Sequence, residues 1–218
     1  MEIKIMDKVL AANDAWAEQN RTFLREKKIT MFNLIGSPGA GKTTLLERTI
    51  DSLKDAISIA VIEGDIATLK DAERIQKKGV PVYQINTGNA CHLDAHLVNA
   101  ALKEITKEKK IQIVFVENIG NLVCPAEFDI GEQGKIAVLS VTEGDDKIEK
   151  YPLLFAEATA LIIAKMGLLE HTNFNIDYAH TVFRKINKDA SIFKIDSLRG
   201  DGFDAWLAYI MQEMKNNK

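Results

Sequence analysis

The chain has 218 residues, and 28 basic against 31 acidic side chains give it a net charge of −3. This length suits one domain with a full hydrophobic core, because single cores grow to about 250 residues before a chain divides. The balance of charge offers no basic surface for DNA or RNA. The longest apolar run, 158–164, is too short to span a bilayer and residues 1–14 lack the apolar stretch of a secretory signal, so we expect a cytoplasmic protein with no nucleic-acid or membrane partner.

The first predicted element is a helix over residues 7–25, where apolar side chains recur at helical spacing between charged ones. Seven short apolar segments after it are predicted strands, at 29–35, 57–63, 82–85, 111–117, 136–141, 159–164 and 192–195. Helices are predicted between and after these strands, at 42–53, 68–78, 93–107, 150–157, 176–188 and 203–215.

The alternation of strands and helices predicts an α/β fold with a doubly wound, mostly parallel sheet and helices on both faces. We expect residues 1–218 to form one domain, with residues 1–28 as an N-terminal helical extension. In open sheets of this kind, ligands bind beyond the carboxyl ends of the strands. The segments that follow the strands are therefore where we expect a functional site.

Residues 36–43 join the first predicted strand to a helix and match the phosphate-binding pattern G-x-x-x-x-G-K-[ST] at every position. Glycines allow successive backbone N–H groups to converge on an anion, and the helix N-terminus adds a positive dipole. We expect Lys42 to reach the terminal phosphates and Thr43 to ligate Mg²⁺. The nucleotide-binding residues predicted here are Gly36, Ser37, Pro38, Gly39, Ala40, Gly41, Lys42, Thr43 and Thr44.

Acidic residues lie at the ends of two predicted strands, Asp65 beyond the second and Glu117 at the end of the fourth. Nucleotide hydrolysis needs acids in such places to hold Mg²⁺ and to orient the attacking water. Glu117 has the position of a Walker B acid, and the N–H of Gly120 is a candidate donor to a terminal phosphate. The predicted Mg²⁺ ligands are Thr43, Asp65 and Glu117, and the predicted catalytic residues are Lys42, Asp65 and Glu117.

Cys91, His92 and Cys124 form a possible metal site, because both of their segments follow predicted strands and are expected at the same edge of the sheet. Soft and borderline ligands of this kind suit Zn²⁺ or Ni²⁺. The spacing lacks the close pairing of cysteines that makes a zinc assignment strong. Buried structural thiols and a catalytic thiol are therefore alternatives that the residues alone leave open.

The surroundings of the first cysteine favour a thiolate. Cys91 and His92 are expected at the start of helix 93–107, where the helix dipole lowers a thiol pKa. His96, one turn later, is an outer candidate for the same site. His171 and His180 have no companion ligands in the sequence and are expected on the surface.

Together these segments resemble the HypB-type nickel-incorporation GTPases, which belong to the SIMIBI class of phosphate-loop NTPases and help to mature [NiFe] hydrogenases. The resemblance covers nearly the whole chain. It is carried by the phosphate loop, Glu63-Gly64-Asp65, Asn86-Thr87-Gly88, Cys91-His92-Leu93-Asp94-Ala95, residues 117–125 with Asn-Leu-Val-Cys-Pro at their end, Thr142-Glu143-Gly144-Asp145-Asp146-Lys147 and Tyr151-Pro152.

The resemblance implies that Cys91, His92 and Cys124 bind Ni²⁺ or Zn²⁺ and that GTP is hydrolysed to GDP and phosphate. It further implies a homodimer formed on nucleotide or metal binding, with a HypA-type nickel metallochaperone and the hydrogenase large subunit as partners. Many members carry a second, N-terminal metal site rich in cysteine or histidine. No cysteine or histidine precedes Cys91 here, so we expect this nickel store to be missing.

A second departure concerns base recognition. The family motif Asn-Lys-x-Asp is replaced by residues 164–167, which keep Lys165 as a nucleotide-binding candidate but have Ala164 and Gly167 in place of the Asn and the Asp. A carboxylate there would accept hydrogen bonds from guanine N1–H and from its 2-amino group. We therefore predict weakened guanine selectivity unless another acid, such as Glu170, substitutes.

With this resemblance, we expect a metal-binding GTPase that assists nickel insertion. Its turnover is expected to be slow, because no arginine is evident as a catalytic finger. Lys147 is a further candidate for phosphate contact, although an exposed loop lysine is by default solvated. Two alternatives remain from other classes. One is a small-molecule kinase with the same phosphate loop, and the other is a dimerisation module that responds to metal and nucleotide with little hydrolysis.

Overall fold

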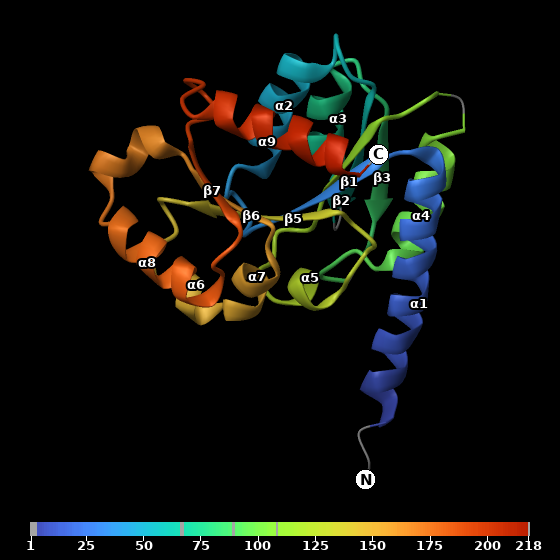
Figure 1. The fold of residues 1–218 in the computed structure, drawn as a ribbon, viewed down its shortest axis with the longest axis horizontal. Coiled ribbons are helices and arrows are strands. Elements are labelled where there is room, and N and C mark those ends of the chain that lie inside the picture. Colours follow the sequence, from blue (N-terminus) through green and yellow to red (C-terminus); the bar gives the residue numbers. More distant parts are fainter. Residues whose placement is uncertain (1–3, 66–67, 89, 108, 218) are drawn as a thin grey trace.

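The computed structural model describes residues 4–65, 68–88, 90–107 and 109–217. Within them lies a parallel sheet with strand order β3-β2-β4-β1-β5-β6-β7 (Figure 1). The strands are β1 (Thr30–Ile35), β2 (Ile59–Asp65), β3 (Val82–Asn86), β4 (Ile113–Glu117), β5 (Gly134–Ser140), β6 (Ala160–Ala164) and β7 (Ser191–Ile195). This arrangement confirms the predicted doubly wound α/β fold and each of the predicted strands, with shifts at their ends.

Helices cover both faces of the sheet (Figure 1). Their bounds are α1 (Lys4–Lys27), α2 (Lys42–Leu53), α3 (Lys70–Gln76), α4 (Ala95–Ile105), α5 (Cys124–Glu127), α6 (Lys147–Lys150), α7 (Pro152–Glu157), the 3₁₀ helix η1 (Met166–His171), α8 (Ile176–Ile186) and α9 (Phe203–Asn216). Alternate side chains of the strands point to opposite faces, so Leu34 packs with α2 and α9 whereas Ile35 packs with α7 and α8. No helix in the described part of the chain is long and apolar enough to cross a membrane.

The structure corrects several predicted helix bounds. The helix expected at 93–107 begins only at Ala95, because Asp94 is its N-cap and accepts a hydrogen bond from Leu97 N. The helix expected at 150–157 begins only at Pro152, as α7, and Lys150 instead ends the short helix α6, which was not expected. The helix expected at 68–78 spans only α3, and neither α5 nor η1 was expected.

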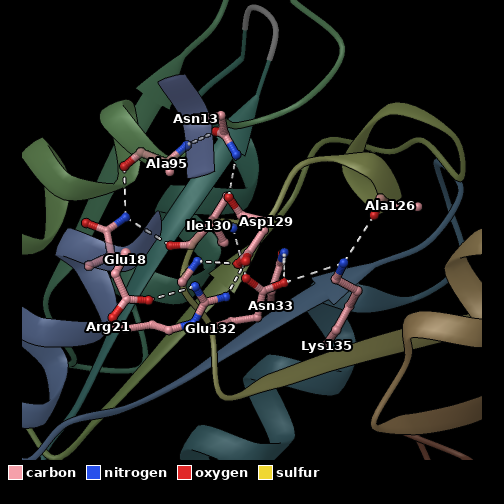
Figure 2. Close-up of polar contacts among 12 residues, drawn as sticks. Asn13, Glu18, Arg21, Asn33, Ala95, Ala126, Asp129, Ile130, Glu132 and Lys135 are labelled. Carbon is pink, nitrogen blue, oxygen red and sulfur yellow. Dashed lines mark hydrogen bonds and ion pairs between the residues drawn. The ribbon is translucent and has the colours of Figure 1, made fainter. Parts of the chain in front are cut away.

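The N-terminal helix α1 packs against α4 through buried asparagines (Figure 2). Asn20, which is fully buried, donates to Ala95 O at 2.8 Å and to Ile130 O at 2.9 Å, and its own oxygen accepts from Asn99 Nδ2 at 2.7 Å. Asn13 accepts from Ala95 N at 2.9 Å. Two side chains of α1 therefore hold the first residue of α4, Asn13 at its N–H and Asn20 at its carbonyl.

The same helix also holds the loop that leads into β5 (Figure 2). Arg21 forms an ion pair with Asp129, whose pKa is lowered despite its burial because Arg21 and Gly131 N donate hydrogen bonds to it. Glu132, two residues before β5, accepts from Asn33 Nδ2 at 3.1 Å on β1. Polar contacts thus connect α1, the loop and the centre of the sheet.

Candidate nucleotide and metal site

The phosphate loop lies between β1 and α2, at the carboxyl edge of the sheet. Gly39 and Gly41 adopt positive φ angles of 75° and 104°, a backbone conformation that favours glycine. Lys42 Nζ donates to Gly36 O at 3.1 Å and to Ser37 O at 3.3 Å, so its ammonium folds back over the loop. The loop therefore has the conformation that an anion-binding nest requires.

A cavity of about 470 Å³ opens beside this loop. Its walls come from the phosphate loop, the end of β2, the start of α3 and the segment after β4. Of the predicted site residues, the cavity is lined by Pro38, Gly39, Gly41, Lys42, Thr43, Thr44, Asp65, Glu117, Gly120 and Lys165. The structure thus brings most of the predicted nucleotide site together.

Two buried glutamates face each other in this cavity. Glu63 of β2 is opposite Glu117 of β4 in the parallel register, and Glu117 Oε1 accepts from Thr43 Oγ1 at 2.9 Å. Glu63 Oε1 and Glu117 Oε2 are buried without a hydrogen-bond partner. Burial raises the pKa of both carboxyls, and the nearby charge of Glu117 raises that of Glu63 further. Unpaired carboxylate oxygens beside a hydroxyl are a donor set that fits Mg²⁺.

The remaining charged residues of the cavity include Asp71 and Arg74 of α3, which the sequence did not indicate. Asp65 Oδ2 accepts from the backbone and hydroxyl of Thr68. Arg74 of α3 lines the cavity and donates to Thr44 Oγ1 at 3.1 Å and to Glu47 Oε2 at 2.6 Å. No local pattern in the sequence could have predicted this place for Arg74, because only the packing of α3 against α2 brings its side chain to the phosphate loop.

The two candidate lysines outside the phosphate loop lie in different places. Lys165 has a left-handed backbone, with φ at 59°, and its Nζ donates to Gly39 O at 2.6 Å. Lys147 begins α6, and its Nζ lies 5.9 Å from the ring centroid of Tyr151. It is not among the described residues that line the phosphate cavity.

Cys91, His92 and Cys124 come together at the same edge of the sheet. One ligand atom from each lies within 4.8 Å of the others, and the two sulfurs are 2.8 Å apart. The side chains are partly exposed, and His92 packs on Phe128 with ring centroids 3.8 Å apart. Burial lowers the pKa of His92, which favours the neutral imidazole that binds metal.

The expected helix-dipole effect on Cys91 is wrong. Cys91 and His92 lie in the loop before α4, and the hydrogen bond with Cys124 raises the pKa of the Cys91 thiol. His96, the outer candidate, packs on Trp16 of α1 with ring centroids 4.7 Å apart, outside the group of three. His171 and His180 are exposed, as expected.

Hydrogen bonds join the metal loop to the nucleotide cavity. Asn118, which lines the cavity, accepts from Leu93 N at 3.2 Å, and Asn121 donates to Cys91 O at 3.3 Å. Gly64, between the two acids of β2, lies so close to Leu93 that a Cβ there would meet the leucine side chain at 2.9 Å. The cysteine–histidine loop therefore packs directly on the end of β2 and on the segment after β4.

A phosphate loop at the edge of a parallel sheet, with an acidic pair beside it, defines a phosphate-loop NTPase, here with a cysteine–histidine group next to the nucleotide cavity. Residues 30–194 match the family model described as CobW/HypB/UreG, nucleotide-binding domain. The chain belongs to this family, and within it to the HypB group, whose curated members it matches over almost its full length.

Three similar proteins illustrate the identity and the coverage of these matches. The hydrogenase maturation factor HypB of Escherichia coli (strain K12) is 45% identical over 210 residues, which cover 96% of this chain and 71% of the relative. A probable hydrogenase maturation factor HypB of Methanocaldococcus jannaschii is 40% identical over 216 residues, covering 99% and 97%. The crystal structure of HypB from Helicobacter pylori in complex with nickel superposes with a TM-score of 0.90 at 36% identity, covering 94% and 96%.

Proposed function

We propose that this chain is a metal-binding GTPase that hydrolyses GTP to GDP and phosphate and assists nickel insertion during [NiFe] hydrogenase maturation. One observation carries the proposal: a group of two thiols and an imidazole within 4.8 Å of one another is hydrogen-bonded to the segment that lines the phosphate cavity. The names of the curated relatives and the nickel-bound structure of one of them support the same function.

In this proposal the phosphate loop holds the triphosphate and Lys42 compensates its charge. Thr43, Asp65 and Glu117 hold Mg²⁺, and Glu63 becomes a further candidate because its free oxygen faces the same cavity. Mg²⁺ supplies charge neutralisation at the phosphates when it is bound. Asp65 and Glu117 also orient the attacking water, and Gly120 N–H and Lys165 complete the nucleotide contacts. Lys147 stays a proposed nucleotide contact, although it begins α6 and does not line the described part of the phosphate cavity.

Cys91, His92 and Cys124 bind Ni²⁺ or Zn²⁺ as cargo. Three ligands leave a coordination position open, which suits a metal that is handed on rather than kept. A second copy of the chain could supply the missing ligand, in keeping with a homodimer formed on nucleotide or metal binding. A HypA-type metallochaperone and the hydrogenase large subunit are the proposed partners, and the protein is proposed to act in the cytoplasm.

Phosphate release from GTP, without any added acceptor, tests the enzymatic half of this proposal. Lys42→Ala is expected to lower the rate by about 100-fold or more, because it removes the cation that faces the terminal phosphates. Lys194→Ala, on the exposed side of β7, is the control and is expected to leave the rate unchanged. A protein that transferred phosphate only when a small-molecule acceptor was present would be a kinase, and one that dimerised without releasing phosphate would be a structural module.

The contacts around Asn121 support linkage between nucleotide and metal. Asn121 Oδ1 accepts from Val123 N at 2.9 Å while its amide donates to Cys91 O, so one side chain connects the loops of both cysteines. Gly120, directly before it, packs so closely on Pro38 that a Cβ would meet the proline nitrogen at 2.8 Å. A change at the phosphates that moves Gly120 must therefore move a metal loop.

We expect Asn121→Ala to reduce the ratio of nickel affinities between the GDP state and a GTP-analogue state by about threefold or more, since coupling free energies are of order 1–3 kcal/mol. Nickel titrations in both nucleotide states measure that ratio. Asn173→Ala, at an exposed asparagine, is the control. An unchanged ratio in Asn121→Ala would remove this side chain from the linkage.

A further inference from the structure

A second cavity, of about 400 Å³, adjoins the phosphate cavity. It shares Gly41, Thr44 and Lys165 with the first, and its other walls come from η1 and from the segment after β7. Because the two cavities share these residues, the second cavity is the neighbouring space into which a nucleotide bound at the phosphate loop would extend its base. The residues that line it therefore decide which base is accepted.

One buried acid lines this cavity. Asp196 follows β7 directly and is only 6% exposed. Its Oδ1 accepts from Leu198 N and Arg199 N at 2.9 Å each, and its Oδ2 accepts from Gly167 N at 2.7 Å. These N–H groups outweigh burial and lower the pKa of Asp196, so it is a carboxylate at neutral pH. A carboxylate has about four acceptor positions. The three N–H groups use two on Oδ1 and one on Oδ2, so one acceptor position remains on Oδ2.

The position of this carboxylate explains the glycine opposite it. A Cβ on Gly167 would lie 2.2 Å from Asp196 Oδ2, well inside van der Waals contact. The Asp196 carboxylate, together with the Arg199 guanidinium whose Cζ would be 3.2 Å from that Cβ, therefore occupies the space into which a side chain at position 167 would point. A carboxylate from the segment after β7 thus lies beside the position at which the family motif has its acid.

The segment that carries Asp196 is tied to the phosphate loop. Arg48 of α2 donates to Ser197 O and Leu198 O at 3.3 Å, and its guanidinium lies 5.3 Å from the ring centroid of Phe203. Because α2 begins at the phosphate loop, the distance between the phosphate-binding N–H groups and Asp196 is fixed by packing within the fold.

Guanine matches such an acceptor and adenine does not. Guanine presents two donors on one edge, N1–H and the 2-amino group, whereas adenine presents an acceptor at N1 and has no amino group at C2. A carboxylate accepts only, so it attracts the first edge and repels the second. We infer that Asp196 is the specificity-determining residue of this chain: its carboxylate accepts a hydrogen bond from guanine in place of a side chain at position 167. The inference rests on the proposed GTPase function.

The test is a set of affinities for GDP, XDP and ADP, measured by titration on the full chain. Wild type is expected to prefer GDP. Asp196→Asn keeps the size of the side chain but offers an amide N–H, which suits the 2-carbonyl of xanthine, so the ratio of GDP to XDP affinity is expected to fall by about tenfold or more. A structural role alone would weaken all three nucleotides together and leave this ratio unchanged.

Two further variants sharpen the result. Gly167→Asp alone is expected to weaken binding of every nucleotide, because the new side chain collides with Asp196. Gly167→Asp combined with Asp196→Ala restores one carboxylate at the same place and is expected to recover GDP preference over Asp196→Ala. Glu170→Gln, at an exposed acid, should leave the preference unchanged.

Three outcomes would overturn the inference while the proposed function stands: equal affinity of wild type for the three nucleotides, an unchanged GDP to XDP ratio in Asp196→Asn, or loss of preference in Glu170→Gln alone. Failure of wild type to bind any of the three would overturn the proposed function together with it. Because the measured quantity is a ratio of affinities, a smaller folded fraction of a variant leaves it unaffected.

Discussion

Cys124→Ala is expected to weaken nickel binding by about 100-fold or more, since loss of even outer-shell support typically costs 10–100-fold in metal affinity. Cys91→Ala should have a similar effect, because the two sulfurs are 2.8 Å apart and belong to one ligand set. Either change leaves only one thiol with His92. Competition against a chromophoric chelator measures the affinity for each variant.

The matched control for this experiment is His180→Ala, which removes an exposed imidazole of α8 far along the chain from the cysteine–histidine group. It is expected to bind nickel as wild type does, whereas the nickel affinity of His92→Ala should be lowered like that of the cysteine variants. If Cys124→Ala retained wild-type affinity, the metal would have to be bound elsewhere, and the two thiols would be structural.

Asn20→Ala is expected to lower the free energy of unfolding by about 3 kcal/mol or more. The change removes three hydrogen bonds and leaves the carbonyls of Ala95 and Ile130 and the amide of Asn99 buried without this partner. A lost hydrogen bond that strands a buried group costs about 1–3 kcal/mol. Denaturant unfolding followed by circular dichroism measures the change.

Gln19→Ala is the control, because Gln19 is an exposed amide one position earlier on α1. Its effect should stay within about 0.5 kcal/mol, as is usual for surface changes. Equal stabilities of Asn20→Ala and Gln19→Ala would mean that α1 adds little to the fold. A large difference would support our proposal that residues 1–28 extend the same domain as the sheet.

Local patterns in the sequence were sufficient for the fold class. Each strand is a short apolar segment, and the loop 36–43 contains every residue that its backbone conformation needs, including the positive φ of Gly39 and Gly41. Helix ends were less predictable. The start of α4 depends on whether Asp94 caps the helix, and the division of α6 from α7 depends on one proline.

The family resemblance favoured the three residues as a metal site, whereas their spacing alone left structural thiols and a catalytic thiol open. Cys91 and Cys124 meet because β3 and β4 run parallel, with β2 between them, and so deliver their following loops to one edge. The carboxyl pair was predictable only in part. Glu63 was part of a motif, but its place opposite Glu117 follows from the pairing of β2 with β4.

By itself, the sequence determined the phosphate loop, the strands and the longer helices in their order along the chain, and the kinds of donor atoms available. Those depend on residues that are neighbours in the chain. Only the tertiary structure decided that Arg74 reaches the phosphate cavity and that the carboxylate of Asp196 fills the space beside Gly167. Such contacts are set by strand register and by the packing of helices on the sheet. Gly167 and Asp196 are 29 positions apart, so no local sequence pattern predicts their contact.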